Sequence, residues 1–202
     1  MFYQPGKTDH GLPHNPFKAL ITPRPIGWIS SVNPKGEANL APFSYFNAVA
    51  DTPPMIMYSS TGTKRDGSAK DTLSNIRATG EFIHHIVGRN MTDAMNISSG
   101  DYPNGEDEFA KAGLEKVPGE LVAAPRVKTA DAAMECRLWK IIELPGENNH
   151  MVIGEVIGIH ISESILVNGM VDPLTYEPMA RLGYRDYSAV EKRFSLNRPG
   201  QK

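Results

Sequence analysis

Short apolar segments separated by turn residues run along most of the chain, and this pattern predicts strands rather than long helices. The predicted strands are, in chain order, Ile26–Val32, Asn39–Phe46, Met55–Ser60, Glu81–Val87, Ala133–Leu144, His150–Ile161 and Ile165–Val167. The two longest are joined by Pro145-Gly146-Glu147-Asn148-Asn149, which favours a hairpin. Because Pro42 interrupts the second segment, we expect that strand to become a loop.

Three segments have helical features. Leu73 and Ile76 have helical spacing within Lys70–Thr79, where Asp71 or Ser68 is available as a cap and Gly80 as the stop. Two further short helices are predicted at Met91–Ser98 and Glu106–Ala112, on either side of the loop Gly100–Gly105.

Neither an internal repeat nor a break in composition divides the chain, so we expect one domain over residues 1–202. Within it, residues 1–20 form an irregular lead-in, and a polar C-terminal extension occupies about residues 172–202. The predicted fold is mainly β with a few short helices, and closure of the sheet into a barrel would remove its exposed edges.

Composition narrows the class of protein. Hydrophobic residues make up 40% of the chain, charged residues 22%, and the formal net charge is -2, which gives no reason to expect nucleic acid as a partner. The apolar runs are too short to span a bilayer, and Met1–Gly6 carries none of the regions of a signal peptide. A single cysteine, Cys136, fits a reducing compartment, so we expect a cytoplasmic protein without a membrane partner.

One candidate site is an aromatic corner at Asn39–Asn47, where small, aromatic and amide-bearing residues meet as the strand turns irregular. Irregular backbone beside a rigid sheet offers both an apolar surface and polar groups to a flat ring such as a flavin. The alternative is an ordinary strand-to-loop corner packed by aromatic side chains.

A second candidate is the polar loop Ser59–Lys64, which follows a strand and precedes the helix that begins with Lys70-Asp71-Thr72. Hydroxyl groups, lysines and a helix N-terminus together favour an anion such as phosphate. The spacing is not that of a Walker loop, and the alternative is a solvated loop with a normal helix cap.

Other residues are less specific. Trp28 is more often a core residue in such a strand, and Arg24 between two prolines has the features of a surface ion-pair member. His84 and His85 point to opposite faces of a strand, so we expect no metal site. His150, at the end of a strand, could donate a hydrogen bond to a reduced ring or simply face solvent.

Several catalytic templates are absent from the sequence. Neither a nucleophile elbow nor a Gly-x-Gly-x-x-Gly motif is present, and Cys136 lies in an apolar strand where a thiolate is disfavoured. The acidic run Glu106–Glu108 is typical of a solvated helix start.

An ordered series of motifs resembles the flavin reductase-like family, which includes flavoredoxins and the reductase components of two-component monooxygenases. The matching segments are Pro23–Ser31, Gly36, Asn39–Asn47, Pro53-Pro54, Lys70–Ile76, Glu81-Phe82, His150–Val156 and Arg181–Tyr187. The resemblance implies a Greek-key split β-barrel and a homodimer that holds flavin mononucleotide (FMN) near the subunit interface.

The same resemblance assigns roles to individual residues. The flavin and its ribityl chain would lie against Trp28, Ser30, Asn39, Ala41, Pro42, Phe43, Ser44, Tyr45 and Asn47. The phosphate would be held by Ser59, Ser60, Lys64, Lys70 and Thr72. His150 matches a histidine close to the flavin or nicotinamide, and Tyr184 would cover the ring.

The activity implied is transfer of reducing equivalents from NADH or NADPH through FMN to free flavin, a redox partner protein or a small acceptor. In such an enzyme the ring carries the chemistry, which agrees with the absence of an acid–base dyad or triad. Two alternatives remain: a flavoredoxin-like electron carrier that does not oxidise NAD(P)H, and a split-barrel module without flavin.

Overall fold

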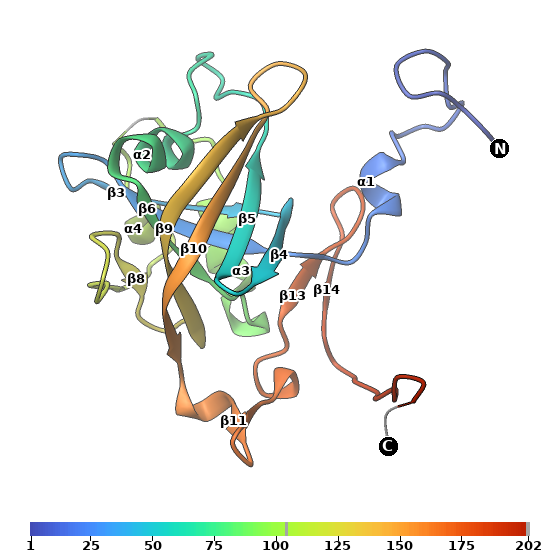
Figure 1. The fold of residues 1–202 in the computed structure, drawn as a ribbon. Coiled ribbons are helices and arrows are strands. Elements are labelled where there is room, and N and C mark those ends of the chain that lie inside the picture. Colours follow the sequence, from blue (N-terminus) through green and yellow to red (C-terminus); the bar gives the residue numbers. More distant parts are fainter. Residues whose placement is uncertain (104, 201–202) are drawn as a thin grey trace.

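The computed structural model describes residues 1–103 and 105–200 (Figure 1). Asn104, in the predicted loop Gly100–Gly105, and residues 201–202 of the predicted C-terminal extension lie outside the described residues. The helices are α1 (Phe17–Leu20), α2 (Asp71–Thr79), η1 (Arg89–Met91), α3 (Thr92–Ser98), α4 (Glu108–Lys111), η2 (Glu163–Ile165) and η3 (Pro173–Thr175). The strands are β1 (Arg24–Pro25), β2 (Gly27–Val32), β3 (Ala38–Phe43), β4 (Phe46–Asp51), β5 (Pro54–Ser60), β6 (Glu81–His85), β7 (Lys116–Val117), β8 (Arg126–Val127), β9 (Ala132–Glu143), β10 (His150–Ile161), β11 (Leu166–Val167), β12 (Met170–Val171), β13 (Met179–Arg181) and β14 (Tyr187–Ala189).

The main sheet has seven antiparallel strands in the order β3-β2-β6-β9-β10-β5-β4. The sheet curls so that β2, next to one edge strand, approaches β4, the other edge strand: a Cβ atom added at Gly27 of β2 would lie 2.4 Å from the Phe46 ring of β4. The predicted mainly β, split-barrel fold is confirmed, and β9 and β10 form the predicted hairpin, with His150 opposite Glu143.

Strand β3 corrects one prediction. It continues through Pro42, which pairs with Trp28 across the ladder, and ends at Phe43. This is possible because β3 is an edge strand, where a residue without an N–H group costs no ladder hydrogen bond. Strand β4 was not predicted, and it begins at Phe46, where a loop was expected.

The predicted helix at Lys70–Thr79 is α2, and Gly80 ends it in the left-handed conformation (φ 74°), with its N–H donating to the Ile76 carbonyl. The expected caps are wrong. The Asp71 carboxylate pairs with Lys64, and the Ser68 hydroxyl donates to Asp66. The helix is therefore held by its contacts with the sheet rather than by a side-chain cap.

Two apolar clusters lie on the two faces of the sheet. The first fills the barrel and packs α2 against it; its largest members include Ile29, Tyr58 and Phe82. The second lies between β2, β3 and the helices α3 and α4, and contains Trp28 with Met95 and Phe109. Burial of these side chains, at about 1.5–3 kcal/mol each, provides the main driving force for the fold.

Short elements of regular structure lie near both ends of the described chain. The short strand β1 pairs with β13, which pairs with β14, and with α1 they lie to one side of the barrel (Figure 1). Arg24 is buried rather than on the surface. Its guanidinium donates to the carbonyls of Lys18, Ile21 and Leu182 and so joins the two ends.

Among the described residues, helices that combine the length and the apolar character needed to cross a bilayer are absent. The single thiol, Cys136, is buried in the barrel and unpaired, and burial raises its pKa. It has no access to a substrate in this position, as the sequence predicts.

Both histidines of β6 are buried. His84 stacks on Phe46, with ring centroids 4.4 Å apart, whereas His85 lies between the Trp28 carbonyl and the Val127 N–H. The Val127 N–H donates to Nε2, so Nδ1 carries the proton and donates to Trp28, and the ring is neutral. Burial lowers the pKa of His84 to about 4 and that of His85 to about 3.

Because both histidines are buried with lowered pKa values, we expect the folded state to lose stability in acid. Below about pH 6.5 these histidines bind protons in the unfolded chain but not in the folded state. The free energy of unfolding is therefore highest above that pH and decreases as the pH falls. We expect His85→Gln, which can keep both hydrogen bonds, to reduce the dependence of the unfolding free energy on pH by about 1.4 kcal/mol per pH unit between pH 6 and 4. Urea unfolding at a series of pH values measures this, with the exposed His14→Gln as control; equal slopes in all three proteins would contradict it.

Candidate functional site

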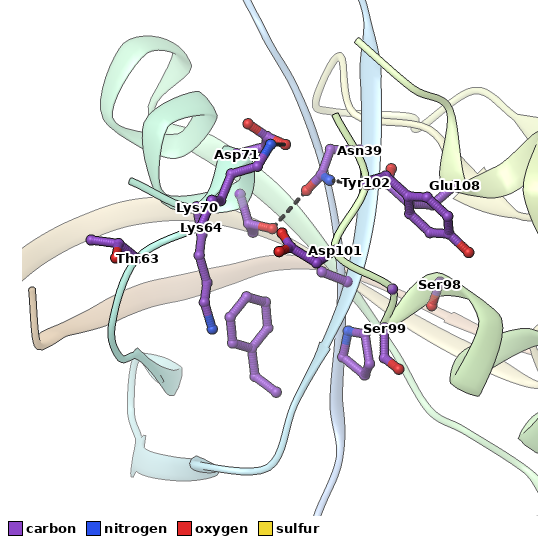
Figure 2. Close-up of a pocket in the computed structure, with 15 residues that line it drawn as sticks. Asn39, Thr63, Lys64, Lys70, Asp71, Ser98, Ser99, Asp101, Tyr102 and Glu108 are labelled. Atoms are coloured by element: carbon purple, nitrogen blue, oxygen red, sulfur yellow. Dashed lines mark hydrogen bonds and ion pairs between the residues drawn. The ribbon is translucent and has the colours of Figure 1, made fainter. Parts of the chain in front are cut away.

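A cavity of about 290 Å³ opens between strand β3, the N-terminus of α2 and the segment that links α3 to α4 (Figure 2). Its lining residues are Asn39, Ala41, Pro42, Phe43, Thr63, Lys64, Lys70, Asp71, Thr72, Ser98, Ser99, Gly100, Asp101, Tyr102 and Glu108. We call it the β3–α2 pocket. It joins the predicted aromatic corner and the predicted phosphate loop, which are separated in sequence.

Two lysines supply positive charge to the pocket. Lys64 Nζ lies 2.8 Å from the Asp71 carboxylate, and its side chain is only 10% exposed. Lys70 Nζ lies 5.9 Å from the centroid of the Phe43 ring. Burial lowers the pKa of Lys70, and the neighbouring charge of Lys18 lowers it further. The charge of Asp101 opposes these effects, and a negatively charged ligand would raise the pKa of Lys70 in the same way.

The N-terminus of α2 contributes a second attraction for anions. The cap residue, Lys70, has extended backbone and its side chain caps nothing within the described part of the chain. The first N–H groups of a helix lack intrahelical partners, and the helix dipole places partial positive charge there. Together with Lys70, they form a site suited to a phosphate group.

Hydrogen bonds among buried polar groups fix the floor of the pocket. Asn39 Nδ2 donates to Glu108 Oε1 (2.8 Å), the Leu40 N–H donates to Glu108 Oε2 (3.1 Å), and Thr72 Oγ1 donates to Asn39 Oδ1 (2.6 Å). Asn39, Thr72 and Glu108 are each less than 8% exposed. This chain of contacts ties α4 and α2 to the edge strand β3, and Figure 2 shows Asn39 at its centre.

The pocket contains part of the set of residues predicted from sequence. The members that line it are Asn39, Ala41, Pro42, Phe43, Lys64, Lys70 and Thr72. The members outside this lining are Trp28, Ser30, Ser44, Tyr45, Asn47, Ser59, Ser60, His150 and Tyr184.

Two of the outlying residues are fully buried. Trp28 is fully buried in the second apolar cluster, and its Nε1 donates to Ser98 Oγ (2.9 Å), so it supports a pocket residue and is not itself in the wall. Ser30 is also fully buried, and its hydroxyl donates to the Pro125 carbonyl. Neither side chain can contact a ligand in this conformation.

Ser60 and His150 lie opposite each other on β5 and β10, at the end of the barrel. Ser60 Oγ and His150 Nδ1 are buried, and no described residue provides either with a hydrogen-bond partner. Ser59 is the next residue of β5 and pairs with Met151. The structure therefore brings Ser60 and His150 together, although not within the β3–α2 pocket.

The remaining predicted residues lie on other surfaces. Ser44 and Tyr45 are half-buried in the turn after β3, and Lys18 Nζ lies 5.9 Å from the Tyr45 ring centroid. Asn47 is exposed on β4. Tyr184 is 53% exposed in the turn between β13 and β14, where its ring lies 5.6 Å from that of His14. In a single chain, Tyr184 belongs to the hairpin outside the barrel.

Several residues of the pocket wall were missed by sequence analysis. They are Thr63, Asp71, Ser98, Ser99, Gly100, Asp101, Tyr102 and Glu108. Glu108 was expected to be solvated, but it is the first residue of α4 and is buried. Asp107 caps this helix by accepting hydrogen bonds from the N–H groups of Phe109 and Ala110. The motif Glu-Asp-Glu before Phe109 offered a cap signal at Asp107, but no signal for burial of its neighbour.

The described residues contain no group of three or more His, Cys, Asp or Glu side chains placed to hold a metal ion. The pocket thus combines a helix N-terminus, two lysines and a wall of small and aromatic side chains.

Comparison with known proteins agrees with this geometry. Residues 19–181 match the model of the flavin reductase like domain. The chain belongs to the flavin reductase-like family. An uncharacterized protein of Aquifex aeolicus is 38% identical over 169 residues, which cover 83% of this chain and 85% of that protein.

Two solved structures are similar to this chain over nearly its whole length. Nitrilotriacetate monooxygenase component B from Bacillus cereus has a TM-score of 0.89 and 32% identity, and the match covers 97% of this chain and 98% of that one. Flavoredoxin of Desulfovibrio vulgaris (Miyazaki F) has a TM-score of 0.79 and 25% identity, with 97% and 100% covered. The flavin reductase-like fold is therefore shared along nearly the whole chain.

Proposed function

We propose that this protein binds FMN and transfers reducing equivalents from NADH or NADPH through the flavin to an acceptor. The observation that carries the proposal is the β3–α2 pocket, in which Lys70 and the N-terminus of α2 converge beside an aromatic wall. Membership of the flavin reductase-like family and the likeness to a monooxygenase component B and a flavoredoxin support it.

The residues present fit the phosphate of FMN. Among the described residues, no carboxylate lies within ion-pair distance of Lys70, and the cap residue of α2 makes no side-chain hydrogen bond to the helix. The lysine and the helix N-terminus can therefore both bind an anion. Lys64 and Thr72 line the same pocket. In this proposal these residues hold the phosphate, and Ser59 and Ser60 lie on the strand that leads into the loop.

The flat ring would lie along the aromatic corner. Ala41, Pro42 and Phe43 form the wall next to the phosphate site, and Ser44, Tyr45 and Asn47 extend it toward β4. Asn39 is held by Glu108 and Thr72 at the base of this wall. His150 and Tyr184 remain proposed neighbours of the flavin or the nicotinamide.

When bound, FMN supplies the electron and hydride chemistry. The protein holds the phosphate, presents one face of an apolar wall and limits access of water to it. No proton-transfer dyad is required of the chain, and the terminal acceptor is free flavin, a redox partner protein or a small molecule.

We also propose that the protein is a homodimer. The pocket of a single chain, at about 290 Å³, is slightly smaller than the 300–1,000 Å³ typical of ligand sites. Apolar side chains are exposed on β10 and the adjoining β11–β12 hairpin, including Ile159 (56%), Ile161 (48%) and Met170 (69%). A second copy of the chain is the proposed occupant of this surface, and a cytoplasmic location stays a prediction.

The proposed activity is tested by purification and stopped-flow absorbance. We expect yellow protein whose released cofactor has the mass of FMN, and rapid bleaching of the flavin absorbance on mixing with NADH or NADPH. Bound FMN without bleaching by either nicotinamide would favour the electron-carrier alternative. Colourless protein that does not bind FMN in a titration would contradict the proposal and favour a module without flavin.

Lys70→Ala should weaken FMN binding by roughly 10- to 150-fold, because a hydrogen bond to a charged group contributes about 1.5–3 kcal/mol. Fluorescence titration of the apoprotein with FMN measures the change. Lys35→Ala, in the exposed turn between β2 and β3, is the matched control and should bind as the wild type does. Equal affinity of the Lys70 variant would remove this lysine from the site.

Replacement of Ile159 and Ile161 together by Glu should produce a monomer, since two buried charges without partners disfavour the interface. Light scattering coupled to size exclusion should give twice the chain mass of 22.2 kDa for the wild type and 22.2 kDa for the double variant. Val49→Glu, on the exposed face of β4, is the control. A monomeric wild type would refute the dimer.

A further inference from the structure

One negative charge of the β3–α2 pocket opposes the binding of a dianion. Two lysines, Lys64 and Lys70, face three carboxylates, Asp71, Asp101 and Glu108. Two of these carboxylates are paired, Asp71 with Lys64 at 2.8 Å and Asp101 with Arg65 at 3.1 Å. Glu108 is the remaining negative charge.

Glu108 lacks a cationic partner throughout residues 1–103 and 105–200. The other acids of its own segment are both paired, Glu106 with Lys111 and Asp107 with Lys116. Glu108 is 6% exposed, and burial raises its pKa, although its hydrogen bonds with backbone N–H groups and with Asn39 oppose the rise. The nearby charge of Asp71 raises it further. The negative charge of a ligand bound in the pocket would also raise the pKa of Glu108.

The hydrogen bonds of Glu108 determine what the Thr72 hydroxyl can do. An ionised carboxylate only accepts, so Glu108 Oε1 requires the NH₂ group of Asn39 on its side. The amide oxygen of Asn39 then faces Thr72 and takes the hydroxyl proton. Thr72 Oγ1 is therefore left with lone pairs, which repel an anion.

A protonated Glu108 permits the opposite arrangement at the same atoms. Oε1 would donate its proton to Asn39 Oδ1 after rotation of the amide, while Oε2 continues to accept from the Leu40 N–H. Asn39 Nδ2 would donate to Thr72 Oγ1. The threonine hydroxyl proton is then free to point toward the pocket.

We propose that Glu108 is a positioning residue that takes up one proton from solvent when a phosphate group binds, and that the chain through Asn39 then reverses so that Thr72 donates to the phosphate. The inference rests on the proposed function, because it assigns the phosphate to the β3–α2 pocket. It makes cofactor affinity depend on pH through a residue that does not contact the ring.

Glu108→Gln tests the proposal, because its amide has the shape of the protonated carboxyl: Nε2 donates to Asn39 and Oε1 accepts from Leu40. We expect this variant to bind FMN roughly 10-fold more tightly than the wild type at pH 8, which is the effect of one hydrogen bond to a charged group. The difference should shrink as the pH falls, because protonation of wild-type Glu108 then costs less free energy. Glu106→Gln, at the surface, should follow the wild type.

Sulfate serves as a second probe, because it remains a dianion across this range of pH whereas the phosphate of FMN titrates. Isothermal titration of the wild type with sulfate, in two buffers of different ionisation enthalpy at several pH values between 6 and 8, should show uptake of up to about one more proton for each anion bound than the Glu108→Gln variant shows. Any titration of Lys70 is common to both proteins and cancels in the comparison.

The possible outcomes separate the two proposals. If wild-type protein binds FMN but Glu108→Gln has equal or weaker affinity at every pH, the role of Glu108 is wrong and the proposed function stands. If FMN does not bind to the wild type, the proposed function fails, and the sulfate titration still decides whether an anion binds with proton uptake. Should Glu108→Gln fail to fold, the wild type alone must still take up protons on binding sulfate, and absence of that uptake would overturn the proposal.

Discussion

The buried amide of Asn39 makes polar contacts with two other elements and so joins three parts of the fold. It lies on the edge strand β3, donates to Glu108 at the start of α4 and accepts from Thr72 in the first turn of α2. A buried amide left without these partners would cost about 1–3 kcal/mol, so the three elements are held in one arrangement. The pocket exists because that arrangement leaves the N-terminus of α2 beside the small and aromatic residues of β3.

The barrel provides a rigid support for this arrangement. Phe43 at the end of β3 packs on Tyr58 of β5, with ring centroids 4.4 Å apart, and Gly27 allows β2 to approach Phe46 of β4. Because the two edges of the sheet meet here, an irregular polar loop can lie over a fixed apolar wall. The chemistry proposed for a bound flavin requires that the protein bind the phosphate with positive charge and hold the ring against a flat apolar surface.

Much of the sheet could be predicted from the sequence. The long strands β9 and β10 and the buried strand β2 contain apolar runs bounded by turn residues, and these patterns depend only on neighbours along the chain. The pairing of β1 with β13 could not be predicted, because it joins Arg24 to a residue more than 150 positions away. The same holds for the burial of Glu108, whose partners Asn39 and Leu40 lie on another element. The acidic residues around Glu108 indicated a solvated side chain, but it is buried. Trp28 is buried as a tryptophan in a strand commonly is.

The central claim is that the β3–α2 pocket holds the phosphate end of a flavin nucleotide. A crystal structure of the protein with FMN tests it most directly. The account predicts phosphate oxygens about 3 Å from Lys70 Nζ and from N–H groups of the first turn of α2. A flavin bound with its phosphate elsewhere, while this pocket stays empty, would contradict it.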